Sequence, residues 1–397
     1  MDAARMTQDV IFLLQGALPV IALYSAALAW SQVRIWVGFG PLGLLFLLIF
    51  LISPPPQTAA LPPMILALWQ IWAVPLALMI APVFWSYIQA LTAEPKGSDT
   101  RLDRADLVPA GIAACAALAA FAMPTPMWRA AFQNGEAELG LGAMLVVGTL
   151  NVMAMLTYVQ WLVYGIRVYR RLVAYRQKLR DLFASTEQKE LLWIHWVIGL
   201  FALNAISGLL LNLVFSIFSL VDADTVSSTI GYQITTLAST LLSLMLVAVF
   251  GVWGLRQRPG LAEARPDAAP EKYNKSALSL PDQQRIARKL NRAMHAEHLY
   301  REPDLSLWRL SDHIGVTPNY LSQTLNEHLQ MSFFDYVNRS RIEEAKSHLL
   351  TSERAVTDIA YDVGFNSRSA FYTAFKRVTG QTPSAFRKAS PQRTVQP

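Results

Sequence analysis

The sequence predicts an all-α protein in two parts: a bundle of seven transmembrane helices, followed by a water-soluble domain of short helices. Two observations lead to this prediction. Of the 397 residues, 53% are hydrophobic and only 16% are charged, which is too apolar a composition for an ordinary soluble protein. The long apolar runs all lie within residues 1–255, whereas residues 256–397 have the composition of a globular domain.

Seven segments have close to the roughly 20 apolar residues that one crossing of a bilayer requires. The fourth is rich in Ala and only weakly hydrophobic, so a re-entrant segment is the alternative for it. The segments lie near residues 10–30, 35–53, 64–91, 107–123, 141–166, 193–220 and 229–254.

The loops between these segments differ in charge, and Lys and Arg in short loops favour the cytoplasmic side. The loop after the fifth segment carries seven Lys or Arg residues, and the loop after the third carries Lys96, Arg101 and Arg104. The loop after the sixth has only Asp222 and Asp224. We therefore expect a multi-pass protein with its N-terminus outside and its C-terminal domain in the cytoplasm.

The interiors of the seven segments contain no Asp, Glu, Lys or Arg, which argues against an ion pump or a proton-coupled transporter. Polar side chains nevertheless follow single helical faces. Hydrogen bonding between packed helices is one explanation, and a polar-lined ligand pocket within the bundle is the other. The candidate pocket residues are Asn151, Tyr158, Asn204, Asn212, Gln233, Thr236 and Thr240, and Ser243 continues the face of the last three.

Residues 257–280 mix Pro, Ala and charged residues without an apolar period, which is typical of a flexible linker. A flexible chain of about 24 residues would reach ~25–30 Å. We therefore divide the sequence into a transmembrane domain (1–256), this linker, a soluble domain (281–390) and a disordered tail (391–397). Such a linker would leave the soluble domain free to move beside the membrane.

Residues 355–388 contain two short amphipathic segments joined by a tight turn. The apolar residues of each segment fall at helical spacing, and Gly364 between them tolerates a positive φ. This pattern is typical of a helix-turn-helix. From Asn366 to the end there are six Lys or Arg residues and no Asp or Glu, which indicates an anionic partner such as nucleic acid. The alternative is a basic helical pair that only packs.

A first helix-turn-helix precedes this one. Its leading helix covers about residues 305–314, Gly315 makes the turn, and Thr317 caps a second helix over 318–329 that has Pro318 at its first position. A helix from Phe333 to Leu350, ~27 Å long, connects the two units. A strut of this length can hold two recognition helices in successive major grooves, which lie ~34 Å apart.

Residues 281–388 resemble the C-terminal DNA-binding domain of the AraC/XylS family of bacterial transcription regulators. The family's IA-x-x-x-GF turn, F-x-x-x-FK-R helix and G-x-(T/S)-P-x-x-(F/Y)-R ending stand at Ile359–Phe365, Phe371–Arg377 and Gly380–Arg387. In the first unit, Ser311, Leu325 and Gln330 depart from the family's usual Ala, Phe and Gly. A Gln in the left-handed conformation that this Gly adopts would be mildly strained.

The resemblance and the helical spacing together predict which side chains meet DNA. Asn and Gln pair with adenine and Arg368 with guanine, whereas Lys376 and Arg377 are expected to contact phosphates. The candidates are Asn319, Tyr320, Ser322, Gln323 and Asn326 in the first unit, and Ser367, Arg368, Ser369, Tyr372, Lys376 and Arg377 in the second.

The sequence thus predicts a sequence-specific DNA-binding transcription regulator, an activator or a repressor, embedded in the bacterial cytoplasmic (inner) membrane as a one-component sensor. The expected partners are promoter DNA, the lipid bilayer, RNA polymerase, a lipophilic or periplasmic signal and a second copy of the chain in a homodimer. We expect no enzymatic activity, cofactor or metal, and the single Cys115 excludes an intramolecular disulfide and a Cys-based zinc site.

Three alternatives remain open at this point. The first is a latent regulator released by proteolysis of the 257–280 linker. The second is a membrane transporter or enzyme with an accessory DNA-binding domain, although the segments lack the acidic or His clusters that it would need. The third is a passive membrane anchor, for which a single span would suffice.

Overall fold

The computed structural model of this protein describes residues 2–53, 63–93, 103–122, 141–186, 189–221, 229–257 and 278–389. For residues 2–8, 11, 63–67, 211–221, 229–236, 238 and 239 it describes the backbone alone. Within these ranges all regular elements are helices, and one isolated β-bridge occurs in addition. The predicted all-α class is therefore confirmed for the described part of the chain. The 258–277 part of the expected linker and the 391–397 tail lie outside it.

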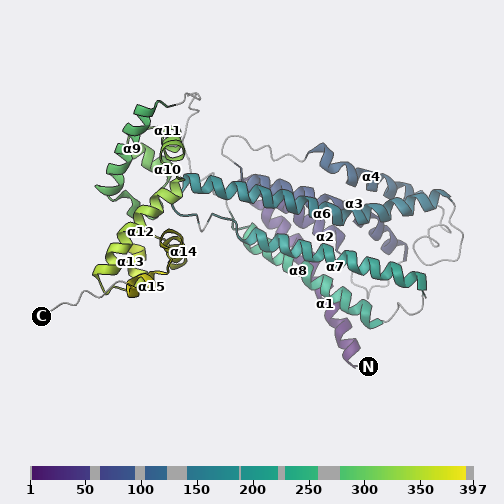
Figure 1. The fold of residues 1–397 in the computed structure, drawn as a ribbon. Coiled ribbons are helices and arrows are strands. Elements are labelled where there is room, and N and C mark those ends of the chain that lie inside the picture. The colour runs from purple at the N-terminus through teal and green to yellow at the C-terminus, as the bar shows by residue number, and fades with distance from the viewer. Residues whose placement is uncertain are drawn as a thin grey trace. The chain divides into compact units, whose positions relative to one another are not determined.

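The chain forms two compact units. The first, here called the N-terminal unit, comprises Met1–Arg171 and Leu192–Pro259, and the second, the C-terminal unit, comprises Leu172–Leu191 and Gly260–Pro397. Figure 1 labels the helices of both units along the chain. The short segment Leu172–Leu191 thus belongs with residues that begin only at Gly260, an arrangement that the sequence did not reveal.

The N-terminal unit is built from apolar helices, and each of the seven expected segments overlaps with one of them. Among the described residues, five regions in α1, α3, α4, α6 and α7 could cross a membrane by length and composition, and two shorter apolar helices cover Phe39–Ile52 and Thr240–Gly254. Seven spans therefore stay a prediction. The helices are α1 (Asp2–Ser31), α2 (Phe39–Ile52), α3 (Pro63–Leu91), α4 (Arg104–Phe121), α6 (Leu141–Leu182), α7 (Trp193–Val221) and α8 (Thr229–Val249).

The interior of this unit is aromatic where α3, α7 and the end of α8 meet. The ring centroids of Phe84 and Phe201 lie 5.5 Å apart, and the ring of Phe250 lies 5.5 Å from the first and 6.1 Å from the second. Phe250 begins η1 (Phe250–Gly254), a π-helical turn that continues α8. The Tyr87 hydroxyl donates a hydrogen bond to the carbonyl of Gly254 at 3.0 Å, which ties α3 to this turn.

Helix α6 corrects one expectation. Residues after 166 were expected to form a charged loop, but the helix continues without a break to Leu182. The reason is a helical apolar face that the many Arg and Lys residues conceal: Val168, Leu172, Tyr175 and Leu179 recur at three- and four-residue intervals, and all four are buried. Arg and Lys are themselves good helix formers. The helix therefore runs from the N-terminal unit into the C-terminal unit.

The C-terminal unit contains two hydrophobic cores, one in each helix-turn-helix. The first gathers Ile286, Leu290 and Met294 of α9 with Leu310 and Leu321, and the second gathers residues of α12, α13 and α14. The elements are α9 (Leu280–His295), η3 (Leu299–Arg301), α10 (Leu307–His313), α11 (Pro318–Gln323), η4 (Thr324–His328), α12 (Phe333–Thr351), α13 (Val356–Asp362), α14 (Arg368–Thr379) and α15 (Pro383–Ala389).

The turns follow the sequence predictions. Gly315 and Gly364 have φ values of 63° and 97°, Thr317 caps α11, and the connecting helix α12 extends from Phe333 to Thr351. Phe365 is buried at the second turn. One apolar residue departs from its expected place, because Val378 in the last turn of α14 is 38% exposed.

The recognition helix of the first unit is less regular than expected. The sequence predicted one helix over 318–329, whereas α11 ends at Gln323 and a π-helical turn, η4, follows. The wide turn buries both Thr324 and Leu325, and the Thr324 hydroxyl donates to the carbonyl of Tyr320 at 2.8 Å. Thr324 and Leu325 lie three and four residues after the buried Leu321, so the apolar spacing is the same as in an α-helix and does not reveal the π-helical turn.

Candidate nucleic-acid interface

The second recognition helix, α14, is fixed by its cap and its buried rings. The Ser367 hydroxyl accepts a hydrogen bond from the amide of Ala370 at 3.1 Å, and Gly380 ends the helix at a φ of 77°. Phe371 and Phe375 are buried, so the opposite face of the helix meets solvent. On that face Arg368, Ser369, Lys376 and Arg377 are exposed and Ser367 and Tyr372 are half-buried.

Arg368 is pre-positioned at the start of α14. Its guanidinium carbon lies 5.0 Å from the centroid of the Tyr372 ring, and Nη2 is 3.5 Å from the Tyr372 hydroxyl. A hydrogen bond with Ser384 and the charge of Arg368 together lower the pKa of the Tyr372 hydroxyl, although burial opposes this shift. A stacked guanidinium keeps N–H donors free at its edge, and two such donors match the O6 and N7 acceptors of guanine.

Arg377 has an acidic partner inside the domain. Its guanidinium forms an ion pair with Asp335 of α12 at 2.6 Å, and its guanidinium carbon lies 5.3 Å from the centroid of the Phe334 ring. A phosphate would have to compete with Asp335 for this residue. The neighbouring Lys376, which is exposed, is therefore the simpler candidate for a backbone contact.

The recognition helix of the first unit presents amides that bond within the helix. Gln323 Nε2 donates to Glu327 Oε2 at 3.0 Å, and Asn326 Nδ2 donates to the Ser322 hydroxyl at 3.4 Å. Asn319 is exposed, whereas Tyr320 packs partly against the first core. Pairing of Gln323 with adenine therefore requires its amide to leave Glu327.

Sequence reasoning missed the residues that join the two helix-turn-helix units, and the foremost is Arg341. Its side chain is fully buried in α12, where Nε donates to the carbonyl of Tyr300 and Nη2 to that of Glu302, both at 2.7 Å. The guanidinium carbon also lies 5.3 Å from the centroid of the Phe365 ring. Burial lowers the pKa of Arg341 to about 10, against the opposing charge of Asp304.

A signal for Arg341 was present in the sequence. Phe333, Val337, Ala345 and Leu349 recur every four residues along the buried side of α12, and Arg341 falls in the middle of that series. A cation on an apolar stripe needs buried acceptors. What the sequence did not show was where those acceptors lie, because Tyr300 and Glu302 are about forty residues away.

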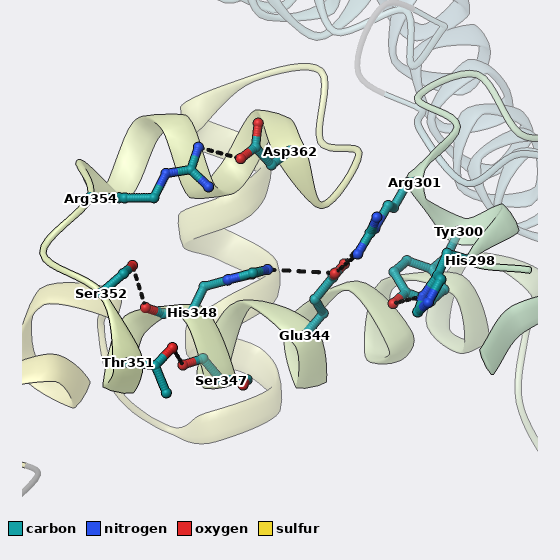
Figure 2. A network of polar contacts seen from close by, with 10 residues as sticks. All are labelled: His298, Tyr300, Arg301, Glu344, Ser347, His348, Thr351, Ser352, Arg354 and Asp362. Carbon is teal, nitrogen blue, oxygen red and sulfur yellow. Dashed lines mark hydrogen bonds and ion pairs between the residues drawn. The ribbon is translucent and has the colours of Figure 1, made fainter. Parts of the chain in front are cut away.

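A second polar network, drawn in Figure 2, ties η3 to α12. Arg301 binds the carboxylate of Glu344, with Nε 3.2 Å from Oε2, and His348 Nε2 lies 3.5 Å from the same carboxylate. Burial raises the pKa of Glu344, but the hydrogen bonds from Arg301, Tyr300 and His348 and the charge of Arg301 outweigh it and leave the pKa lowered. The carboxylate therefore stays ionised at neutral pH and holds Arg301 in place.

The backbone of η3 also approaches the turn of the second unit closely. A Cβ atom at Gly364 would lie 2.7 Å from the carbonyl oxygen of Arg301 and 2.8 Å from that of Tyr300. Only a residue without a side chain fits there. Residues Tyr300–Ser306, here called the joint, thus contact both α12 and the second helix-turn-helix.

The candidate pocket residues of the N-terminal unit are not gathered at one place. Asn204 lines a cavity of 180 Å³ together with Ser243, while Tyr158 lines a separate and largely apolar cavity of 640 Å³ between α3, α6 and α7. Asn151 is exposed and its Nδ2 donates to the carbonyl of Val147 in its own helix. Thr240 is buried. Asn212, Gln233 and Thr236 lie outside the described side chains.

No group of three or more His, Cys, Asp or Glu residues within the described ranges is arranged to hold a metal ion.

Comparison with known proteins places the similarity at the C-terminal end. Residues 310–389 match the profile of a family described as a helix-turn-helix domain. An uncharacterised helix-turn-helix transcriptional regulator from Staphylococcus aureus (strain COL) is 34% identical over 122 residues, which are 31% of this chain and 16% of the relative. The chain thus spans about a sixth of that relative's length.

Two further similarities fall in the same region. The bifunctional transcriptional activator and DNA repair enzyme AdaA from Bacillus subtilis (strain 168) is 34% identical over 86 residues, or 22% of this chain and 41% of AdaA. The solved C-terminal domain of AraT, a response regulator from Geobacillus stearothermophilus, is 29% identical, with 31% of this chain and 95% of that domain covered and a TM-score of 0.26. The predicted resemblance to AraC-type DNA-binding domains is thereby confirmed for the C-terminal region.

Proposed function

We propose that this chain is a membrane-embedded one-component transcription regulator, in which the apolar helices hold the protein in the bacterial cytoplasmic membrane and the C-terminal unit binds promoter DNA. One observation supports it above the others: helices apolar and long enough to cross a bilayer occur in the same chain as an AraC-type helix-turn-helix domain. DNA lies in the cytoplasm, and the Lys and Arg bias of the loops puts the C-terminus there independently.

Reporter fusions along the chain test the membrane part of this proposal. With seven spans, an enzyme active only outside the cytoplasm should work after every outward loop, and one active only inside should work after every inward loop. A cytoplasmic signal after Asp224 would contradict the seven-span arrangement. The outward positions are Ala60, Ala130 and Asp224, and the inward positions are Thr100, Arg180 and Gly260.

We also propose that the signal is received by the N-terminal unit. The two cavities give a lipophilic molecule places to bind between helices, and Asn204 supplies an amide at the edge of the smaller one. Replacing Asn204 by Leu should shift the response to the signal without loss of protein from the membrane. Dose-response curves that superimpose on those of the wild type would remove Asn204 from the input site.

Proteolytic release of the C-terminal unit is the second candidate function. It is favoured by the Pro-, Ala- and charge-rich composition of residues 257–280, which an endoprotease recognises more readily than a helix. Immunodetection of the C-terminus in fractionated cells distinguishes a regulator that stays in the membrane from one that is released by proteolysis. The regulator that stays in the membrane is found there at full length while its promoter is active, and the released form is found as a short soluble fragment.

A further inference from the structure

We propose that the segment Leu172–Leu191, the end of α6 and the loop after it, is a built-in docking element of the DNA-binding domain, and that its engagement with the joint sets the affinity for DNA. This inference rests on the proposed function, because it names the route by which the membrane part controls the DNA-binding part. The segment is the continuation of α6, which enters the C-terminal unit at Leu172.

The segment is part of the first core rather than a loop beside it. Ala184 is 1% exposed and belongs to the same buried cluster as the residues of α9, α10 and α11. Its amide donates a hydrogen bond to the carbonyl of Leu305 at 3.0 Å, and Phe183 and Ser306 form an antiparallel β-bridge. The Phe183 ring in turn lies 6.3 Å from that of Trp308.

The segment also reaches the second helix-turn-helix. Asn366, the residue before the cap of α14, donates from Nδ2 to the Ser185 hydroxyl at 3.1 Å and to Asp304 Oδ1 at 3.2 Å. One side chain at the start of the second recognition helix is therefore shared between the segment and the joint. A displacement of Ser185 removes one of the two bonds that orient it.

A third contact lies at the start of α12. The Arg180 guanidinium carbon is 5.7 Å from the centroid of the Phe334 ring, on which Arg377 also stacks. Burial and the negative charge of Asp335 raise the pKa of the Asp181 carboxyl group. The segment thus adjoins a cation that was predicted to meet the DNA backbone.

These contacts converge on the region that sets the geometry of the two recognition helices. The joint accepts the hydrogen bonds of Arg341, holds Glu344 through Arg301 and abuts Gly364, and the segment binds the same short stretch at Leu305 and Ser306. Two recognition helices bind one DNA molecule only at the right spacing. The affinity for DNA therefore differs between the docked and the undocked segment, and α6 couples the N-terminal unit to this difference.

A disulfide across the β-bridge tests this proposal in the full-length protein. The amide of Ala184 pairs with the carbonyl of Leu305, which makes Phe183 and Ser306 a pair without mutual hydrogen bonds, with Cα atoms ~4.5 Å apart and within disulfide range. Phe183→Cys with Ser306→Cys, in a Cys115→Ser background, should crosslink under mild oxidation in membranes. The control pair is Phe183→Cys with Thr351→Cys, about 15 Å along α12 from Arg341.

The affinity of the two forms is then compared on a DNA duplex selected from random sequence with the reduced protein. We expect the Kd values of the oxidised and reduced forms to differ at least about fivefold. Because coupling is reciprocal, saturating duplex should speed crosslinking if the crosslinked form binds DNA more tightly, and slow it if that form binds more weakly. A yield no higher than that of the control pair overturns the docking, and equal Kd values overturn its role in DNA binding. Absence of selected DNA would count against the proposed function, while the crosslink yield would still decide the docking.

A paired insertion tests the route through α6. Four Gly and Ser residues inserted between Arg171 and Leu172 interrupt the helix but leave every docking residue intact, whereas the same insertion after Ala268 lengthens the 257–280 linker. Output of the target promoter in cells should change at least about fivefold with the first insertion and stay at the wild-type level with the second. If the variant with the insertion after Arg171 gives the same promoter output as the wild type, and its cysteine-substituted form still makes the 183–306 crosslink, coupling through α6 is contradicted.

Discussion

At the scale of single residues, the C-terminal unit depends on a buried cation. Arg341 satisfies two backbone carbonyls of the joint, and each hydrogen bond to a charged group contributes about 1.5–3 kcal/mol. Replacing Arg341 by Ala should lower the free energy of unfolding of this unit by ~3 kcal/mol or more, since two acceptors lose their partner. Hydrogen exchange of the α12 and α13 amides in the full-length protein measures the loss.

Arg341→Lys is the matched control for that experiment. Lysine keeps the positive charge but brings one ammonium group instead of a fork, so it cannot serve both carbonyls in the same geometry. We expect an intermediate loss of stability. If the free energy of unfolding measured by exchange in the Arg341→Ala variant is within ~0.5 kcal/mol of the wild-type value, the joint does not depend on this residue.

Gln330 stands where the family's usual Gly takes the left-handed conformation, and its φ of 55° lies in that region. The side chain offsets part of the strain, because Nε2 donates to the carbonyl of Glu327 at 2.7 Å. Gln330→Ala keeps the strain and loses the bond, whereas Gln330→Gly loses both. The Gly variant should therefore unfold with a free energy ~1 kcal/mol higher than the Ala variant, in matched denaturation curves. Equal curves would mean that the backbone there is unstrained.

At the scale of elements, the sequence located the helices of both units well because their apolar spacing is local. Prediction from the sequence failed for elements whose structure depends on tertiary contacts rather than on the local residue pattern. The charged part of α6 was taken for a loop, since its six cations concealed the face formed by Val168, Leu172, Tyr175 and Leu179. The π-helical turn η4 and the docking of Ala184 were out of reach for another reason: each depends on partners that only folding brings together.

The two recognition helices are predicted to divide the work on DNA. Gln323→Ala and Arg368→Ala should relax base preference at separate half-sites about one helical turn apart, at ~1–3 kcal/mol of discrimination each. Lys376→Ala should weaken all sequences alike and reduce the salt slope by about one phosphate contact. Titrations of the full-length protein across salt, against the selected site and its single-base variants, measure both effects.

The Gln323→Ala result tests whether the first unit reads a base at all, because the Gln323 amide donates to Glu327 in the structure and must leave it to pair with adenine. Uniform weakening by Gln323→Ala would show that the first unit reads no base and only positions the second. Arg377→Ala is less suitable as a phosphate test, since it also breaks the ion pair with Asp335.

The whole chain combines helices apolar and long enough to cross a bilayer with an AraC-type helix-turn-helix domain. The apolar helices and the AraC-type domain are connected twice, through residues 257–280 and through α6 with its docked segment. The sequence suggested only the first connection, and with it a domain that moves freely on a linker. The contacts of Phe183 and Ala184 with the joint, and of Ser185 with Asn366, favour a domain that responds to α6 instead.

The proposed regulator binds specific DNA as an intact chain in the membrane, and the DNA that can be crosslinked to it in living cells tests this. Membranes are isolated after formaldehyde treatment, and the DNA attached to the 397-residue chain is sequenced. We predict a few loci that share two half-sites about one helical turn apart. No enrichment at full length, or enrichment only with a shorter soluble fragment, would contradict it.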